Sequence, residues 1–426
     1  MVIILEIEDS LYQYIERLVP IPRSITGNGV RQTLDILSEI VPIVQHEVPS
    51  GTEAFDWNIP KEWNVNDAYI ITPDGRKIAD FHVNPLHLVG YSPPMRQKMS
   101  LATLQKHLYS LPQQPSAIPY ITSYYEERWG FCLTQQERDH LADGEYEVVI
   151  DSNLHDGSMT YGELIVPGET DEEIMFTSYV CHPYMANNEL SGPVMNAHIA
   201  AYILEQPKRK YTYRFLWLPE TVGAILYLSK HLAYLKQKVI AGFVLSCIGD
   251  ERAFSVVQSR LGNSYADRVV NVVMQFFYSE CKFYSFLDRG SDERQFCAPG
   301  VDLPFVTLCR SKFGEYPEYH TSLDNLDIIS KNGLGQSYDW ILRLYRLIEN
   351  NNKYCVTHFC EPNLGKRGLY DTLSSKGLSA MSRHIRNVLA YCDGNHDVID
   401  ISYRVKLSPD KTMQFLEILK QHNLIH

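Results

Sequence analysis

Four residues capable of metal or acid–base chemistry each follow an apolar run of the chain. His182 follows "EIMFTSYVC", Glu220 follows "YRFLWLP", Asp250 follows "AGFVLSCIG", and His320 lies in "GEYPEYHTSLDN" after "LPFVTLC". Imidazole nitrogens and carboxylate oxygens bind Zn²⁺ and leave a coordination position open for water. The metal lowers the pKa of that water towards about 7, and a nearby Glu can accept the proton and pass it on. Two His and one Asp, with Glu220 held off the metal, are therefore a chemically sensible set.

Each of these residues also has an ordinary structural explanation. A single His after a strand is more often a hydrogen-bonded surface group, and Glu220 in "PETVG" would be favoured by the dipole of a helix that begins there. Asp250 in "IGDER" fits a charged turn, and Asp324 in "HTSLDN" fits a helix cap. A shared site therefore depends on the elements that carry these residues.

Apolar strands alternate with amphipathic helices from about residue 123 to residue 350. The expected strands are "YEVVIDS", "YGELIVPG", "EIMFTSYV", "YRFLWLP", "AGFVLSCIG" and "LPFVTLC", and the expected helices are "GPVMNAHIAAYILEQ", "TVGAILYLSKHLAYLKQ", "NSYADRVVNVVMQFF" and "YDWILRLYRLIENN". This alternation predicts an α/β domain with a largely parallel sheet and helices on both faces. Ligands gather at the carboxyl ends of such strands, so the four residues are expected to meet at one edge.

Three further segments flank this pattern. "DSLYQYIERLVPIPRSITGNGVRQTLDILSEI" predicts two amphipathic helices joined by a Pro/Gly loop. From about Glu53 to Pro94, short alternating runs and a "PDG" turn indicate a small β-rich module. The tail from Asn363 to His426 predicts helices joined by short loops, similar to a winged-helix or helix-turn-helix module. From Tyr370 onward it has seven Lys and Arg and six Asp and Glu, and this near balance favours a packing or protein-contact role over DNA reading.

Composition limits the class of protein. The chain has 426 residues, 45% hydrophobic and 21% charged, which is typical of a globular protein of two or three domains. A net charge of -12 is unfavourable for nucleic-acid binding, which needs clustered Lys and Arg. The first apolar run is too short for a signal peptide, and no run approaches the roughly 20 apolar residues of a membrane helix. The nine cysteines include no Cys-x-x-Cys pair, which favours reduced thiols in a cytoplasmic protein.

The order of the motifs resembles a known family. "H-P…A-N-N-E-L-S-G", "P-E-T-V-G", "G-D-E-R", "S-D-E-R-Q-F" and "E-Y-H-T-S-x-D-N" are similar to bacterial aminopeptidase-like proteins, often labelled polysaccharide biosynthesis proteins. That family is related to zinc exopeptidases of the bacterial leucyl aminopeptidase type, and the resemblance covers essentially the whole chain. It implies a zinc-exopeptidase-like α/β fold with a mostly parallel sheet, an inserted small β-rich domain and a C-terminal winged-helix domain. The implied boundaries are 1–48 with 121–352 for the aminopeptidase-like domain, 49–120 for the insertion and 353–426 for the winged helix.

The resemblance also implies a role for each matching residue. His182 matches a metal-binding His, and Asn188 stands where an Asp bridges two metals. Glu220 matches the general base, while Asp250 and His320 match the two remaining metal ligands. The implied site therefore consists of Glu220 as catalytic residue and His182, Asn188, Asp250 and His320 as metal ligands.

Two positions depart from the related exopeptidases. Thr221 stands where their second Glu ligand lies, which is usual for this branch, whereas Asn188 replaces an Asp that relatives usually carry. A neutral amide oxygen is a weaker ligand than a carboxylate and cannot balance two cations about 3.5–4 Å apart, so one zinc ion is expected rather than two. Three outcomes stay open: one ion on a subset of the ligands with Glu189 turning in, a weak site that empties on purification, and a fold that has lost the reaction.

Residues around the proposed ligands could bind a substrate. Carboxylates in "KFGEYPEYHTS" could hold a free amine, and a Tyr hydroxyl could stabilise an oxyanion. An Arg could bind a carboxylate or phosphate through two parallel hydrogen bonds, although each Arg could instead form a structural ion pair. The residues assigned to substrate binding are Glu189, Asp292, Arg294, Tyr316 and Tyr319.

The leading hypothesis is a zinc-dependent, aminopeptidase-like hydrolase that cleaves an amide or peptide bond with metal-activated water. One alternative is an amidohydrolase or acyl transferase on a sugar or amino-acyl metabolite in polysaccharide biosynthesis, and a polar, arginine-bearing pocket would favour it. The other is a catalytically silent binding protein, which Asn188 supports. The expected partners are a small-molecule or peptide substrate and a second copy of the chain in a homo-oligomer. Neither a membrane nor a nucleic acid is expected.

Overall fold

The computed structural model describes residues 2–124, 126–278, 280–369 and 380–426. The chain forms two compact units. The first consists of Met1–Gly262 and Lys282–Tyr338, and the second of Asn263–Cys281 and Asp339–His426. All nine cysteines are free thiols. Within the described ranges, every helix is too short or too polar to cross a membrane.

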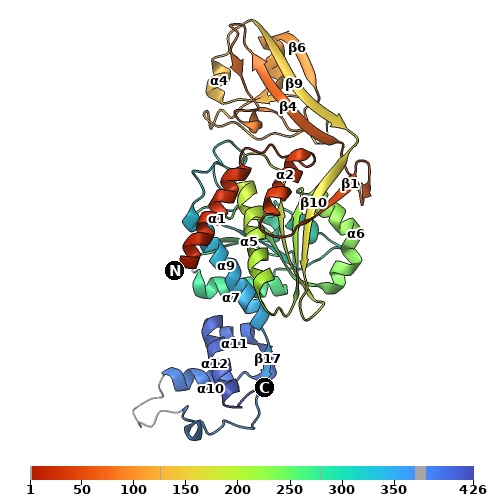
Figure 1. Ribbon diagram of the computed structural model, residues 1–426. Helices are drawn as coiled ribbons and strands as arrows, with labels where there is room; N and C mark the ends of the chain where they lie inside the picture. The colour runs from red at the N-terminus through yellow and green to blue at the C-terminus, as the bar shows by residue number, and fades with distance from the viewer. Residues whose placement is uncertain (1, 125, 279, 370–379) are drawn as a thin grey trace. The chain divides into compact units, whose positions relative to one another are not determined.

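A mixed eight-stranded sheet forms the centre of the first unit (Figure 1). Its order is β1-β10-β12-β11-β13-β16-β14-β15, and the four strands β12, β11, β13 and β16 are parallel to one another. The strands β1, β10 and β14 add antiparallel pairs towards the two edges. The α/β fold with a largely parallel sheet is thus confirmed for the central strands. The bounds are β1 (Val44–Pro49), β10 (Ser158–Val166), β11 (Glu173–Tyr179), β12 (Thr212–Leu218), β13 (Val239–Leu245), β14 (Ser255–Val257), β15 (Lys282–Tyr284) and β16 (Phe305–Cys309).

The central strands are mostly apolar because both faces of the sheet are covered. Every residue of β11 is buried. On one face, the ring of Phe176 stacks on Phe215 and Phe243 of the two neighbouring strands, with centroid distances of 5.5 and 5.1 Å. This burial on both faces explains why apolar runs in the sequence predict the central strands.

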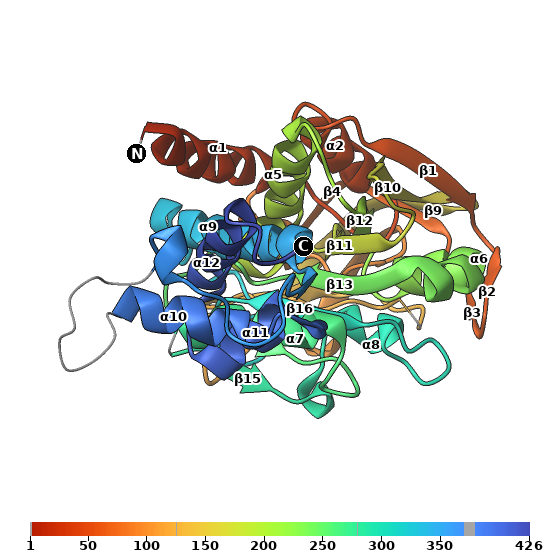
Figure 2. The ribbon, with the colours of Figure 1, turned by 90° about the horizontal axis from the view of Figure 1, so that it is seen from below.

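Helices cover both faces of the sheet, as the alternating pattern predicts. Helices α1 (Val2–Leu18), α2 (Asn28–Leu37) and α5 (Ser191–Glu205) lie on one side, and Figure 2 shows α8 (Glu293–Phe296) on the other. Apolar residues of α6 (Val222–Lys238) and α8 share one core cluster with β12, β13 and β16. Gly192, near the start of α5, approaches the end of β13 so closely that a Cβ would lie 2.4 Å from the Leu245 carbonyl oxygen.

The β-rich module is confirmed as a four-stranded sheet in the order β5-β4-β9-β6. The strand expected at 146–152 was wrongly placed in the large sheet, because β9 pairs with β4 and β6 instead. An apolar run does not reveal which sheet its strand joins. The small sheet consequently includes β9, which lies after the boundary predicted at residue 120. Its strands are β4 (Glu62–Ile71), β5 (Lys77–Ile78), β6 (Met95–Ser100) and β9 (Glu145–His155), and the short elements nearby are β2 (Glu53–Ala54), β3 (Trp57–Asn58), η1 (Pro85–His87), α3 (Leu101–Leu104), η2 (Gln105–His107), β7 (Leu108–Tyr109), β8 (Phe131–Cys132) and α4 (Gln135–Asp139).

The second unit combines helices with a two-stranded sheet. Strands β17 and β18 pair antiparallel, and the last helix begins as its Ser-Pro-Asp sequence predicts, because the Ser408 side chain accepts a hydrogen bond from the Lys411 amide. Residues 370–379 of the predicted tail lie outside the described residues. The elements are α7 (Tyr265–Phe277), the end of α9 (Lys331–Asn350), β17 (Lys353–Cys355), η5 (Gly365–Arg367), α10 (Ala380–Leu389), β18 (Asp393–Asp397), α11 (Val398–Val405) and α12 (Pro409–Gln421).

Removing a central ring should destabilise the first unit strongly. We expect Phe176→Ala to lower the free energy of unfolding by about 3–5 kcal/mol, since it deletes a fully buried ring and leaves a cavity. The matched control is Phe55→Ala, whose side chain is 62% exposed and which should change stability by about 0.5 kcal/mol or less. Denaturant unfolding followed by tryptophan fluorescence checks both, and equal effects of the two changes would contradict this packing.

Candidate functional site

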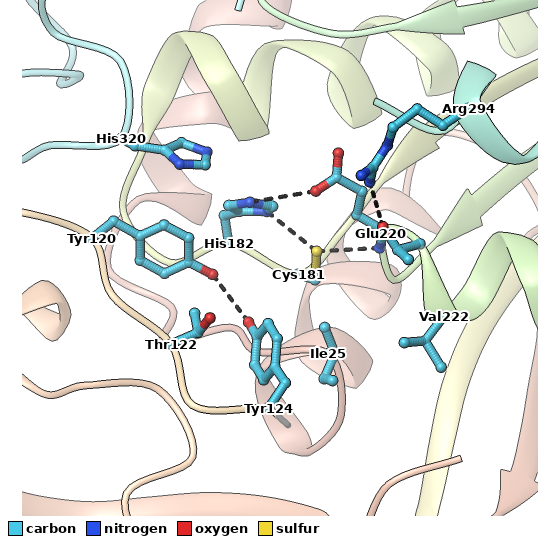
Figure 3. A pocket seen from close by; sticks show the side chains of 11 residues that line it. Ile25, Tyr120, Thr122, Tyr124, Cys181, His182, Glu220, Val222, Arg294 and His320 are labelled. Carbon is cyan, nitrogen blue, oxygen red and sulfur yellow. Dashed lines mark hydrogen bonds and ion pairs between the residues drawn. The ribbon is translucent and has the colours of Figure 1, made fainter. Parts of the chain in front are cut away.

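A pocket of about 280 Å³ lies at the carboxyl ends of the parallel strands (Figure 3). Its walls come from the segments that follow β11, β12 and β16, from the loop before α2, from α8 and from the connector that leads out of the small module. The lining residues are Ile25, Tyr120, Thr122, Tyr124, Cys181, His182, Glu220, Thr221, Val222, Arg294 and His320.

The structure brings the two expected imidazoles together. The rings of His182 and His320 lie 5.3 Å apart between centroids. Burial lowers the pKa of each imidazole to about 3, with the Arg23 charge as a further cause at His182 and the His182 ring as a further cause at His320. Both rings are therefore neutral at neutral pH, which is the form that binds a metal. The Nε2 atom of His320 is buried and has no hydrogen-bond partner among the described residues.

Cys181 and Glu189 both lie against Nδ1 of His182, and the Cys181 thiol is the group within hydrogen-bond geometry, at 3.2 Å. One oxygen of Glu189 lies 3.0 Å from His182 Nδ1, and the other accepts a hydrogen bond of 2.6 Å from the Cys181 amide. Burial raises the pKa of Glu189 to about 8, while the nearby Arg23 guanidinium, 4.0 Å away, opposes this rise. Arg23 Nε also donates to the His182 carbonyl oxygen at 3.0 Å. This arrangement points His182 Nε2 into the pocket, whereas Glu189 is fully buried and does not line it.

The expected general base stands on a strained turn. Glu220 extends into the pocket, where one of its oxygens lies 3.7 Å from His182 Nε2 (Figure 3). Burial raises the pKa of Glu220 well above its usual value, the Asp292 charge adds to this rise, and the Arg294 charge opposes it. The next residue, Thr221, has φ 66° and ψ -72°, and the Val222 amide donates to the Glu220 carbonyl oxygen at 2.8 Å. Such a γ-turn is rare and costs roughly 1–3 kcal/mol for a non-glycine residue, so the surroundings must hold it.

The side chains of Asp292 and Arg294 hold the Thr221 turn. Asp292 accepts a hydrogen bond of 2.8 Å from the Thr221 amide, and Arg294 Nη2 donates to Thr221 Oγ1 at 2.5 Å. Asp292 is fully buried and outside the pocket lining, and burial raises its pKa to about 7. Arg294 does line the pocket, as expected of a substrate-binding residue. The strained backbone of Thr221 thus lies directly after Glu220, whose side chain extends into the pocket.

The Asn-rich loop is a π-helical turn, η3 (Ala186–Leu190), pinned by one carboxylate. The amides of Asn187 and Asn188 donate to the two oxygens of Asp324 at 2.7 and 3.0 Å. The Asn188 side chain donates to the Tyr179 hydroxyl at 2.7 Å, and its Oδ1 is buried without a partner among the described residues. Asn188 does not line the pocket. Single π-turns are frequent at functional sites, and this one leads directly into α5.

Asp250 does not join the imidazoles. Its carboxylate accepts hydrogen bonds from Asn187 Nδ2 at 3.0 Å, from the Ser311 amide and hydroxyl at 2.9 Å each, and from the Arg252 amide at 2.8 Å. It is buried and outside the pocket lining. The expected meeting of three ligands therefore holds for His182 and His320, while Asp250 ties the loops after β11, β13 and β16 together.

The aromatic and acidic residues beside His320 support its loop. The Tyr316 hydroxyl donates to Asp324 at 2.8 Å, and the Tyr319 ring stacks on His320 with a centroid distance of 3.9 Å. Glu318 forms an ion pair of 2.8 Å with Arg252, and neither tyrosine lines the pocket. The carboxylates expected to hold a substrate amine are thus not at the pocket, and the two tyrosines position other groups.

Several functional groups were missed by sequence reasoning. The Pro-rich connector supplies Tyr120 and Tyr124, whose hydroxyls lie 3.0 Å apart, and the Tyr120 amide donates to the His320 carbonyl oxygen at 2.9 Å. Cys181 and Arg23 complete the surroundings of His182. The only signals were an Arg inside the apolar "PIPRSI" loop and aromatic residues in a connector, and neither pattern reveals a contact across the fold.

The pocket offers side chains that could hold a metal ion. Two neutral imidazoles, of which His320 has a buried and unpartnered Nε2 among the described residues, would supply nitrogen donors to a zinc ion. A second ion would need the bridging carboxylate that Asn188 lacks, and Asp250 is saturated with hydrogen bonds. Cys181, His182 and Glu189 also offer ligand atoms within 4.8 Å of one another. That cluster lies on the inner side of the ring, where the Arg23 charge would repel a cation, so the pocket side suits the metal.

Comparisons with known proteins agree with this architecture. Residues 12–351 match the family described as Domain of unknown function (DUF4910), and residues 352–426 match a winged helix-turn-helix family. A protein of Clostridium acetobutylicum is 44% identical over 419 residues, 96% of each chain, and is named putative polysaccharide biosynthesis protein with aminopeptidase-like domain. These matches confirm the resemblance carried by the motifs.

Solved structures show the same fold. The crystal structure of a putative peptidase from Clostridium acetobutylicum has a TM-score of 0.94 at 42% identity, covering 99% of this chain and 97% of that chain. A zinc aminopeptidase from Bacillus subtilis has a TM-score of 0.55 at 13% identity, covering 79% of this chain and 93% of that chain. At 13% identity, the similarity to the Bacillus subtilis aminopeptidase shows a shared fold alone.

Removing the carboxylate that pins the Asn-rich turn should destabilise the first unit. In Asp324→Ala, two buried amides and the Tyr316 hydroxyl would lose their acceptor, and we expect a loss of about 2–5 kcal/mol in the free energy of unfolding. Asp327→Ala, three positions along and exposed, is the matched control and should be neutral. Thermal and denaturant unfolding measure both, and a neutral Asp324→Ala would show that Asp324 does not anchor the turn.

Proposed function

The chain belongs to the DUF4910 family, and we propose that it is an aminopeptidase-like hydrolase that cleaves an amide or peptide bond with the help of one zinc ion. The observation that carries the proposal is the convergence of His182 Nε2, His320 and Glu220 on one pocket at the carboxyl ends of parallel strands. Side chains up to 138 positions apart meet there, and an isolated surface histidine would not require such an arrangement.

His182 and His320 are the residues that would hold the metal. Both are neutral, both lie at the pocket, and Glu189 fixes the first ring so that its Nε2 stays directed outward. A bound zinc ion supplies a Lewis acid that polarises the amide carbonyl and makes water more acidic. Asn188, Asp250 and Thr221 take no part in holding it, since none offers a free carboxylate to the pocket.

Glu220 is the proton carrier of the proposed reaction. Burial raises the pKa of Glu220, which makes its carboxylate a stronger base than an exposed glutamate. Glu220 accepts a proton from the attacking water and delivers it to the amide nitrogen as the carbon–nitrogen bond breaks. The Thr221 turn, held by Asp292 and Arg294, keeps the Glu220 carboxylate directed into the pocket, where it can reach the attacking water.

The character of the pocket also favours the second candidate, an amide-bearing metabolite. Among the described lining residues, only Ile25 and Val222 are purely aliphatic, and Arg294 contributes a charge. A pocket that selects an apolar peptide side chain would be lined mainly by hydrophobic groups. The name of the Clostridium acetobutylicum relative refers to polysaccharide biosynthesis, which is compatible with a polar metabolite.

Metal binding tests the donor set directly. We expect the purified chain, after incubation with zinc and removal of excess, to retain about one zinc ion per chain. His320→Ala and His182→Ala should each lose most of it, because each removes one of two imidazole ligands. His140→Ala, an exposed histidine, should retain wild-type zinc, and elemental analysis gives the stoichiometry. Undiminished zinc in both pocket variants would refute this donor set.

Catalysis tests the role of Glu220. With zinc present, Glu220→Gln should lower kcat by about 10²–10⁴-fold on any amide that the wild type hydrolyses, because Gln cannot carry the proton. Glu251→Gln, at an exposed glutamate, should leave kcat unchanged. A panel of amino-acyl amides, dipeptides and N-acyl amino acids, assayed by amine release, supplies the rates. A fully active Glu220→Gln variant would remove Glu220 from the mechanism.

A further inference from the structure

We infer that the substrate is a small amide that carries a carboxylate close to the bond to be cleaved, and that Arg294 binds this carboxylate. The inference rests on the proposed function, because it names the substrate class of the same pocket. It replaces the usual expectation for an aminopeptidase-like fold, in which the charged group next to the scissile bond is a free amine.

Arg294 presents unused donors to the pocket. Its Nε donates to the Ser291 carbonyl oxygen at 2.9 Å, and its Nη2 donates to Thr221 Oγ1 at 2.5 Å. Among the described residues, the guanidinium forms no ion pair within 4.0 Å, and its hydrogen bonds are those of Nε and Nη2. A guanidinium has five N–H donors in a planar fork that matches a carboxylate. The two bonds already made hold that fork in place, so little further order is needed to bind an anion.

The pocket has no spare carboxylate for an ammonium group. Glu220 is the only acidic residue among its described lining, and the proposed reaction uses it. Glu189 is fully buried against His182 and Arg23, and Asp292 is buried with one oxygen on the Thr221 amide. A free amine bound here would therefore lack a counter-charge, whereas an anion would find one.

The charge balance points to a carboxylate rather than a phosphate. Arg294 is the only Lys or Arg among the described lining residues, and Glu220 and Asp292 both interact with it electrostatically. A dianion would bring two charges to a single cation that already faces two acidic groups. A carboxylate brings one charge and has the planar shape that the arginine fork binds best.

The geometry places the anion close to the reacting amide. Figure 3 shows the Glu220 carboxylate between the His182 ring and the Arg294 guanidinium. The volume of about 280 Å³ is at or below the lower end of ordinary small-molecule sites, roughly 300–1,000 Å³. The substrate is therefore compact. Water adds across its carbon–nitrogen bond, so that a carboxylic acid and an amine are formed and one proton passes from water to the nitrogen.

Matched substrates test the inference on the full-length, zinc-supplemented protein. The probes are N-acetylalanine and succinamate, which carry a carboxylate on either half of the amide, the uncharged N-acetylalanine amide, and alanine amide with its free amine. We expect kcat/KM for at least one carboxylate probe to exceed that for both other amides by about tenfold or more, as expected for hydrogen bonds to a charged group. Arg294→Gln should abolish the preference, mainly through KM, while Arg289→Gln at a neighbouring exposed arginine should preserve it.

Binding without turnover separates recognition from catalysis. On the Glu220→Gln variant, calorimetry should detect binding of N-acetylalanine. The signal for N-acetylalanine amide should be weaker or absent. Inorganic phosphate should bind no more tightly than N-acetylalanine. The double variant Glu220→Gln with Arg294→Lys keeps the positive charge but lacks the planar guanidinium, so it should bind N-acetylalanine more weakly. This variant provides the test if Arg294→Gln fails to fold.

The outcomes distinguish the two proposals. Turnover that favours alanine amide would overturn the carboxylate inference and leave the hydrolase standing. Absence of turnover together with Arg294-dependent binding of N-acetylalanine would support the recognition and overturn the hydrolase. Binding of phosphate in preference to N-acetylalanine, or binding that ignores Arg294, would overturn the inference.

Discussion

The site depends on the buried surroundings of His182 Nδ1, where the Cys181 thiol lies 3.2 Å and a Glu189 oxygen 3.0 Å from this nitrogen. A carboxylate buried without partners would cost several kcal/mol, so Glu189 persists only because the Cys181 amide and the Arg23 guanidinium stand beside it. Together, Glu189 and the Cys181 thiol restrict the orientation of the imidazole. The other nitrogen of the ring is thereby committed to the pocket, where His320 and Glu220 lie. Carboxylate–histidine pairs of this kind commonly set the direction and basicity of a metal ligand.

The rest of the first unit brings polar groups to this contact and holds them against strain. Parallel strands deliver His182 and Glu220 to one edge of the sheet, and the Thr221 turn aims the second of them inward. The π-helical turn at Asn188 is unusual backbone in a buried place, and Asp324 compensates by accepting its amides. The fold thus concentrates irregular backbone around the pocket, while the apolar strands beneath provide the stability that tolerates it.

The sequence was informative wherever local pattern and topology agree. The strand ends predicted His182, Glu220 and His320 correctly as neighbours, because apolar runs mark parallel strands and parallel strands share an edge. Asp250 has the same sequence context but turns away, since the side chain of Asn187 and the Ser311 loop satisfy its carboxylate. No local pattern could show that competition for hydrogen bonds.

Sequence patterns could not predict the contacts between distant segments of the chain. Arg23 stands in an N-terminal loop, 159 positions before the carbonyl it binds, and Tyr120 comes from a connector that carries no chemical motif. The assignment of β9 failed for a similar reason, because a strand's alternation records burial and not its partner strand. The chemistry of single residues was thus easier to predict than the network that orients them.

Anomalous scattering at the zinc edge, from a crystal grown with zinc, tests the central claim most directly. The account predicts one peak, bonded to Nε2 of both His182 and His320 on the pocket side of the rings. A peak on the inner side, between the Cys181 thiol and Glu189, would contradict it, as would two peaks or none.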